Sequence, residues 1–150
     1  MRLAEQLEGL AAEILAETEV PQPVSAFVLA DAVYLKLTPV GAYEEGIVGN
    51  EVRFNTRLKA REQHESVFRY ASRYLLERTG HYATDHAVVR LARALALPRD
   101  RFLADVQRGQ TFGWLMAQYP YASDAMIGAR VGELATQQQR RARGAHALTR

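Results

Sequence analysis

The adjacent residues His64 and Glu65 are the only fragment of the zinc-binding motif HExxH in the sequence. In that motif a second histidine follows the first by four residues, so both imidazoles lie on one helical face, and the glutamate acts as general base. Four residues after His64 the chain has Phe68, which offers no metal-binding atom. The pair alone therefore does not predict a zinc peptidase.

The other histidines offer a second route to a metal site. The chain has four histidines and no cysteine, so disulfides, thiolate catalysis and cysteine-bound zinc are excluded, and ligands must be His, Asp or Glu. If two successive helices pack side by side, one alternative metal set is His64, His81, Asp85 and His86. His81 and His86 are also explained as an ordinary loop residue and an ordinary helix-start residue. His146 is expected to be solvated near the C-terminus.

The composition is that of an ordinary globular domain. The 150 residues are 48% hydrophobic and 24% charged, with a net charge of +2, and this length suits one domain with a real core. Residues 1–15 alternate charged and apolar positions at helical spacing, so no signal peptide is expected, and no segment approaches a membrane span. We therefore expect a cytoplasmic protein.

Periodicity and turn residues predict an α+β fold that is mainly helical, with a small three-stranded antiparallel sheet. The strands are expected within 33–40 and on either side of the turn Gly49-Asn50, the last one ending at Asn55. The expected helices cover residues 3 to before 21, 25–32, 57–78, 84–97, 99–107, 111–119 and 123–134. We assign the domain to residues 1–135 and a basic, solvated tail to residues 136–150.

The order of these elements, over roughly residues 4–134, resembles the ImmA/IrrE family of zinc peptidase-like regulators. Residues 62–76 are similar to the zinc helix of that family. In that helix a polar, arginine-rich segment and a short apolar stretch precede the HExxH motif, which is followed by an aromatic residue and two leucines. In this register Arg69 and Arg73 stand where the ligating histidines belong. Tyr70 stands at the position of the catalytic glutamate. The resemblance thus implies a zincin-like fold with a degenerate site.

The same resemblance implies that one of three metal ligands remains. The third ligand of the family is an acidic residue at the head of the next helix, and counting back from Leu97 and Pro98 brings that position to Asp85. Guanidinium groups stay protonated at physiological pH, so Arg69 and Arg73 would repel a divalent cation. No zinc and no peptidase activity are expected.

Two interpretations of these arginines stay open. In the first, Asp85 pairs with Arg69 or Arg73 and ties two helices together where the metal does so in active relatives. In the second, the arginines belong to a solvated stripe with Glu65 and Glu77 at four-residue spacing, in which each ion pair contributes about 0.3–0.5 kcal/mol. The two interpretations differ on whether the former metal site is filled or is an open groove.

The C-terminal part resembles the helix-turn-helix-like element that follows the peptidase core in this family, within residues 110–135. Contact with nucleic acid would use a set of arginines: Arg130, Arg140, Arg141 and Arg143. Because the second helix begins with Asp124 and carries only Arg130 along it, packing against the core is favoured over DNA binding. The expected buried set is Trp114, Leu115, Tyr119, Ile127 and Val131.

These features predict a catalytically inactive, cytoplasmic regulatory protein without a cofactor. The resemblance implies its partner, because active members of the family cleave or relieve helix-turn-helix repressors in mobile elements and stress responses. One alternative is a zinc metallopeptidase with non-standard ligands that cleaves such a repressor. The other alternative is a DNA-binding regulator. No glycine-rich phosphate loop and no G-x-S-x-G elbow occurs in the sequence.

Overall fold

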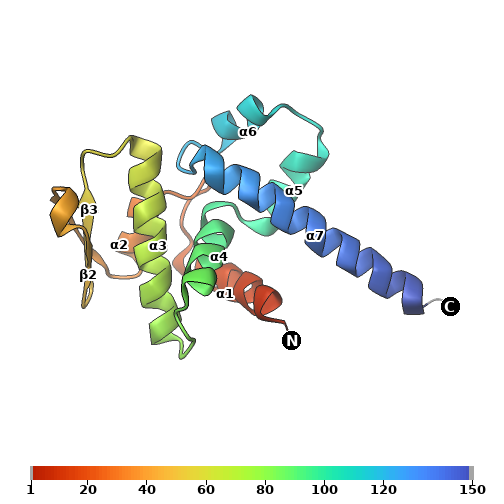
Figure 1. Cartoon of the computed structure of the whole chain (residues 1–150), viewed down its shortest axis with the longest axis horizontal. Coiled ribbons are helices and arrows are strands. Elements are labelled where there is room, and N and C mark those ends of the chain that lie inside the picture. The colour runs from red at the N-terminus through yellow and green to blue at the C-terminus, as the bar shows by residue number, and fades with distance from the viewer. Residues whose placement is uncertain (1, 149–150) are drawn as a thin grey trace.

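Seven α-helices and one three-stranded sheet make up residues 2–148, which are the residues that the computed structural model describes, with side chains for residues 2–144 (Figure 1). The helices are α1 (Leu3–Thr18), α2 (Ala26–Ala32), α3 (Ala60–Arg78), α4 (Asp85–Ala96), α5 (Arg99–Gln107), α6 (Phe112–Gln118) and α7 (Asp124–Leu148). The strands are β1 (Lys36–Val40), β2 (Gly46–Val48) and β3 (Glu51–Asn55), with a 3-10 turn η1 (Ala42–Glu44) after β1. The predicted α+β class is confirmed. No helix among the described residues is long and apolar enough to cross a membrane.

The sheet is mixed, which corrects the expectation of three antiparallel strands. β2 and β3 form the predicted antiparallel hairpin across Gly49, whose φ of 60° suits glycine. However, β3 lies in the middle, and β1 pairs with its other edge in parallel, from Lys36 opposite Glu51 to Val40 opposite Asn55. Two reversals of direction, at η1 and at the hairpin, make β1 and β3 parallel. The sequence pattern does not reveal whether β1 pairs with β2 or with β3.

A turn of three residues separates α2 from β1, where the strand was predicted to follow the helix directly. The backbone N–H groups of Tyr34 and Leu35 donate to the carbonyls of Asp31 and Ala30, at 3.0 and 2.9 Å. Tyr34 adopts a left-handed conformation with φ of 66°. These bonds complete the end of α2, so β1 begins at Lys36 rather than at residue 33.

Side-chain caps begin four of the helices where the sequence places Ser or Thr before an apolar run. Ser25, Thr84, Thr111 and Ser123 each accept a hydrogen bond from the backbone N–H three residues later, at 3.1–3.5 Å. Pro98 lies two residues after the end of α4, and Gly80, with φ of 77°, lies two residues after the end of α3. The predicted starts of these four helices are confirmed to within a few residues.

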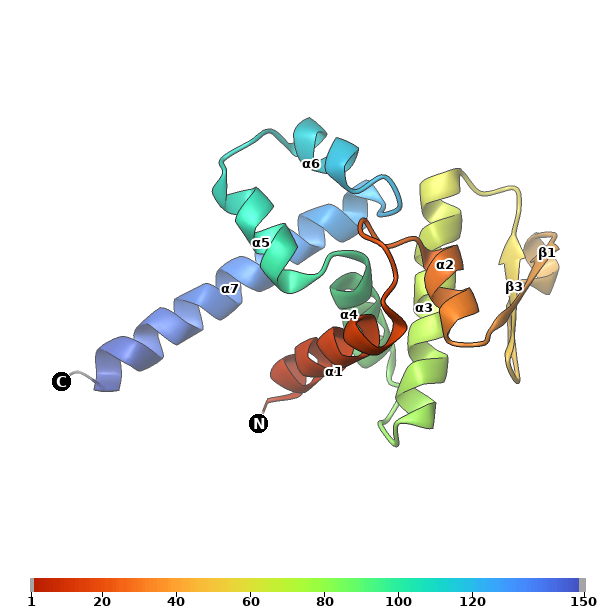
Figure 2. The same ribbon diagram turned by 180° about the vertical axis from the view of Figure 1, so that it is seen from behind.

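α3 is the central element of the fold. Figures 1 and 2 show it between the sheet and α2 on one side and the remaining helices on the other. It packs on α2 and β3 as well as on α4, and α4 in turn packs on α1. Its buried residues Val67, Phe68, Ala71, Leu75 and Leu76 repeat at helical spacing. This amphipathic pattern buries one face and leaves the charged face in solvent.

The C-terminal helices pack on the body as predicted, but α7 is longer. Leu115, Tyr119 and Ile127 are buried, while Trp114 and Val131 are partly buried against the same core. α7 does not end at residue 134 but continues to Leu148 through the segment expected to be a tail. Gln, Arg and Ala dominate that segment and favour helix, so nothing in it terminates the helix. Figure 1 shows this part of α7 projecting beyond the rest of the molecule.

Candidate functional site

The charged face of α3 holds both ion pairs that the sequence suggested. Arg69 Nη2 lies 3.2 Å from Glu65 Oε1, one helical turn away. Arg73 Nη2 lies 3.9 Å from Asp85 Oδ1 at the start of α4, a distance too long for a hydrogen bond. The Asp85 side chain is fully exposed. Solvent therefore screens the contact between α3 and α4, and we expect it to contribute little to stability.

Tyr70 lies on the side of α3 that faces the sheet region. Its ring is partly buried and packs against the core. Burial, reinforced by the nearby carboxylate of Glu45, raises the pKa of its phenol, against the opposing effect of Arg73 and Arg69. The phenol thus stays protonated at neutral pH. A neutral phenol cannot replace a glutamate as general base at that pH.

His64 joins three parts of the structure rather than facing solvent. Its Nδ1 accepts a hydrogen bond from the backbone N–H of Ala26 at 3.1 Å. Its ring lies between Phe27 of α2 and Tyr121 of the turn before α7, with centroids 4.6 and 4.7 Å away. Burial lowers its pKa from 6.5 to about 4. His64 is therefore a neutral packing residue that holds α2 against α3.

The alternative zinc set is not brought together. His64 is buried in the first half of α3, whereas His81 follows the far end of that helix, where its Nδ1 lies 2.9 Å from Thr79 Oγ1. At 1.5 Å per residue, the stretch from His64 to the end of α3 is roughly 20 Å long. Asp85 and His86 are exposed at the start of α4. Within the described part of the chain, no three His, Asp or Glu side chains group as metal ligands. The side chain of His146 lies outside the described residues.

Only a small cavity adjoins Arg69. It measures about 80 Å³ and is lined by residues of α3, α4 and α7: Glu65, Arg69, Val89, Ala92, Arg93, Ala125 and Met126. Sites that enclose small ligands usually reach about 300 Å³ or more. This cavity is therefore too small to hold a peptide segment.

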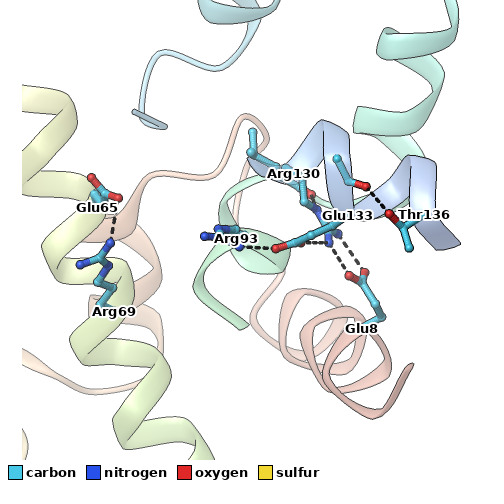
Figure 3. A network of polar contacts seen from close by, with 9 residues as sticks. Glu8, Glu65, Arg69, Arg93, Arg130, Glu133 and Thr136 are labelled. Carbon is cyan, nitrogen blue, oxygen red and sulfur yellow. Dashed lines mark hydrogen bonds and ion pairs between the residues drawn. The ribbon is translucent and has the colours of Figure 1, made fainter. Parts of the chain in front are cut away.

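Arg130 is buried, which corrects its assignment as a nucleic-acid contact (Figure 3). Its guanidinium binds both carboxylate oxygens of Glu8 on α1, with Nη2 2.8 Å from Oε2. Its Nε donates to the carbonyl of Leu97 at 3.1 Å, and its Nη1 lies 3.3 Å from Glu133, which also binds Arg93. The Arg130 side chain is 0% exposed to solvent, so it cannot contact a phosphate group. One feature of the sequence indicates this burial, because Arg130 falls on the apolar stripe of α7.

Arg61, in the first turn of α3, makes a further contact that was not predicted from the sequence. Its guanidinium donates to the carbonyls of Met116, Tyr119 and Ala122, at 2.9–3.0 Å. These carbonyls lie at the end of α6 and in the turn before α7, where backbone acceptors have no helical partner. Arg61 thus ties the C-terminal helices to α3. Nothing in the spacing of residues predicts this contact.

The three remaining candidate arginines lie on the projecting part of α7. Arg140, Arg141 and Arg143 are exposed. No ion pair joins them to a carboxylate within residues 2–144. Their charges are therefore available to an anionic partner.

Comparison with known proteins identifies no relative of this chain. No protein-family model, no curated protein and no solved structure matches it. The resemblance to the ImmA/IrrE family remains a prediction that rests on the quoted residues.

Proposed function

We propose that this chain is a non-catalytic regulatory domain that binds a protein partner in the cytoplasm. The observation that most supports the proposal is the position of Arg69 and Arg73 on the exposed face of α3. In the register of the ImmA/IrrE resemblance these two permanent cations replace both histidine ligands, and Arg73 lies beside the remaining acidic position, Asp85. Such a face repels a divalent metal ion.

The proposed partner is a helix-turn-helix transcriptional repressor or a related regulator. This step rests on the resemblance, since fold alone does not define function. A domain that binds a repressor without cutting it would act by occupying it, or by competing with an active relative for it. Neither mechanism requires a cofactor.

The two other functions receive less support. A zinc peptidase built on the alternative ligand set would need His64, whose ring is buried between Phe27 and Tyr121 and whose Nδ1 is already hydrogen-bonded. A DNA-binding surface would lose Arg130, which is bound to Glu8. The arginines on the projecting end of α7 would then have to supply the phosphate contacts alone.

Incubation with a repressor tests the proposal. The chain is mixed with the helix-turn-helix repressor encoded nearest to its gene, with zinc added, and the mixture is analysed by size-exclusion chromatography and intact-mass spectrometry. We expect a complex in which the repressor keeps its full mass. Repressor fragments that a chelator prevents, and that Asp85→Ala abolishes, would show a peptidase. Absence of any complex would contradict the proposed partner class.

A further inference from the structure

A groove of about 1100 Å³ lies between α1, the start of α5 and the projecting part of α7. It is far larger than the cavity beside Arg69. One wall is α1 and the other is the segment of α7 around Gln137 and Arg141. Figure 2 shows these two helices from behind, with α7 extending past α1. The bond between Arg130 and Glu8 joins the two walls at the inner end of the groove.

Small apolar side chains form much of the α1 wall. Ala12 and Ala16 are exposed there, and Leu15 is partly buried beside them. Ala94 of α4 and Pro98 continue this surface toward α5. Alanine-rich helix faces allow another helix to approach closely, because no long side chain separates the two backbones.

Positive charge surrounds this apolar surface. Five arginines line the groove, namely Arg2, Arg99, Arg101, Arg140 and Arg141. Three acidic residues also line it, but Glu8 is already bound to Arg130, which leaves Glu5 and Asp100. Among the described residues, Arg2, Arg140 and Arg141 form no ion pair. The groove therefore favours an anionic occupant.

Several polar atoms in the groove wall have no hydrogen-bond partner. Both the amide nitrogen and the amide oxygen of Gln137 are buried without one, as is Nε of Arg99. The start of α5 at Pro98 has no side-chain cap. Buried polar groups normally find partners, so rotation of the Gln137 and Arg99 side chains toward an occupant of the groove would satisfy these atoms.

We infer that this groove binds an amphipathic α-helix of the protein partner, with apolar residues against α1 and acidic residues toward the arginines. The inference rests on the proposed function, since it names the surface and the kind of segment that are recognised. A helix about 10 Å in diameter and about 14 Å long, roughly nine residues, fills such a volume. Helix-in-groove binding uses this combination of an apolar face and charged edges.

The groove suits a protein helix better than nucleic acid. A phosphate backbone would meet the alanines of α1, which offer it no hydrogen bond. It would also approach the carboxylates of Glu5 and Asp100, which repel it. An acidic helix can place its apolar face on the alanines and keep its carboxylates at the arginine edge.

A synthetic peptide tests the inference directly. The probe is a fluorescein-labelled amphipathic helix with leucines on one face and glutamates beside them, titrated with the full chain and followed by fluorescence anisotropy. We expect binding that weakens at least about tenfold in Arg140→Glu/Arg141→Glu, and no binding of the same peptide with lysines in place of glutamates. Arg57→Glu/Lys59→Glu makes the same charge change at an exposed site before α3 and is expected to bind normally.

A second pair of variants tests shape instead of charge. Ala12→Trp fills the groove from an exposed position on α1, whereas Ala104→Trp adds the same bulk to an exposed position on α5 outside it. Only the first is expected to weaken binding. No binding by the wild-type chain, or equal losses in both members of either pair, would overturn the inference. The inference would also be overturned if the wild-type chain bound a DNA duplex more tightly than the peptide and Arg140→Glu/Arg141→Glu abolished that DNA binding.

The same variants separate this inference from the proposed function. If the repressor forms a complex equally well with the wild-type chain and with Arg140→Glu/Arg141→Glu, the proposed function stands and the groove is not its site. If the glutamate peptide binds but the repressor does not, the groove is a helix-binding site for another partner and the proposed partner class is wrong.

Discussion

Arg130→Ala is expected to lower the free energy of unfolding by about 3–5 kcal/mol, the usual cost of removing one partner from a buried ion pair. The substitution leaves the carboxylate of Glu8, whose side chain is 9% exposed, without its bidentate partner. It also removes the bond to the carbonyl of Leu97. Urea unfolding at neutral pH, followed by circular dichroism, measures the change.

Two controls define what this result means. Arg140→Ala removes an exposed arginine from the same helix and is expected to change the unfolding free energy by less than about 0.5 kcal/mol. Glu8→Leu/Arg130→Met removes both charges and is expected to be clearly more stable than Arg130→Ala, because it does not leave the largely buried carboxylate of Glu8 without its partner. If Arg130→Ala were as mild as Arg140→Ala, the buried network would not anchor α7 to α1.

Lowering the pH from 7 to 5 is expected to cost about 2 kcal/mol of stability through His64 alone. The pKa of His64 is about 4 in the folded chain, below its ordinary 6.5. Between these values the unfolded chain binds a proton that the folded chain does not, so acid favours unfolding. The contribution is fully present above pH 6.5 and disappears as the pH falls toward 4. Urea midpoints at several pH values measure it.

A variant of an exposed histidine is the control for assigning this pH dependence to His64. His86→Gln, at an exposed position, is expected to keep the full pH dependence, whereas His64→Gln is expected to flatten it while lowering stability at pH 7. Titration of the imidazole resonances by NMR gives the pKa itself. A value above 6 for His64 would contradict its role as a buried neutral ring.

Much of the helical fold was predictable because local signals agree. The apolar periodicity of α1 and α3, and caps such as Thr84 and Ser123, act within a few residues of the element that they define. The sheet was less predictable, because the sequence pattern allows β1 to pair with either strand of the hairpin. The extension of α7 was missed because an arginine-rich segment also resembles a solvated tail.

The candidate site was predictable only in part. The pair Glu65 and Arg69 follows from helical spacing, and the approach of Arg73 to Asp85 follows from the packing of successive helices. In contrast, Arg130 binds Glu8 from 122 positions away, and Arg61 binds carbonyls 55–61 positions away. Such contacts depend on the assembled fold. The large groove also depends on the assembled fold, since its walls come from both ends of the chain.

The zinc content of the chain, purified without chelator and without a histidine tag, decides whether this is a non-catalytic domain. Elemental analysis is compared with Asp85→Ala and His86→Ala, the two exposed residues best placed to bind a metal ion near Arg73. We expect less than about a tenth of an equivalent in all three proteins, because permanent cations repel the metal. Close to one equivalent of zinc, lost in either variant, would contradict a non-catalytic domain and would identify a metal centre beside α3.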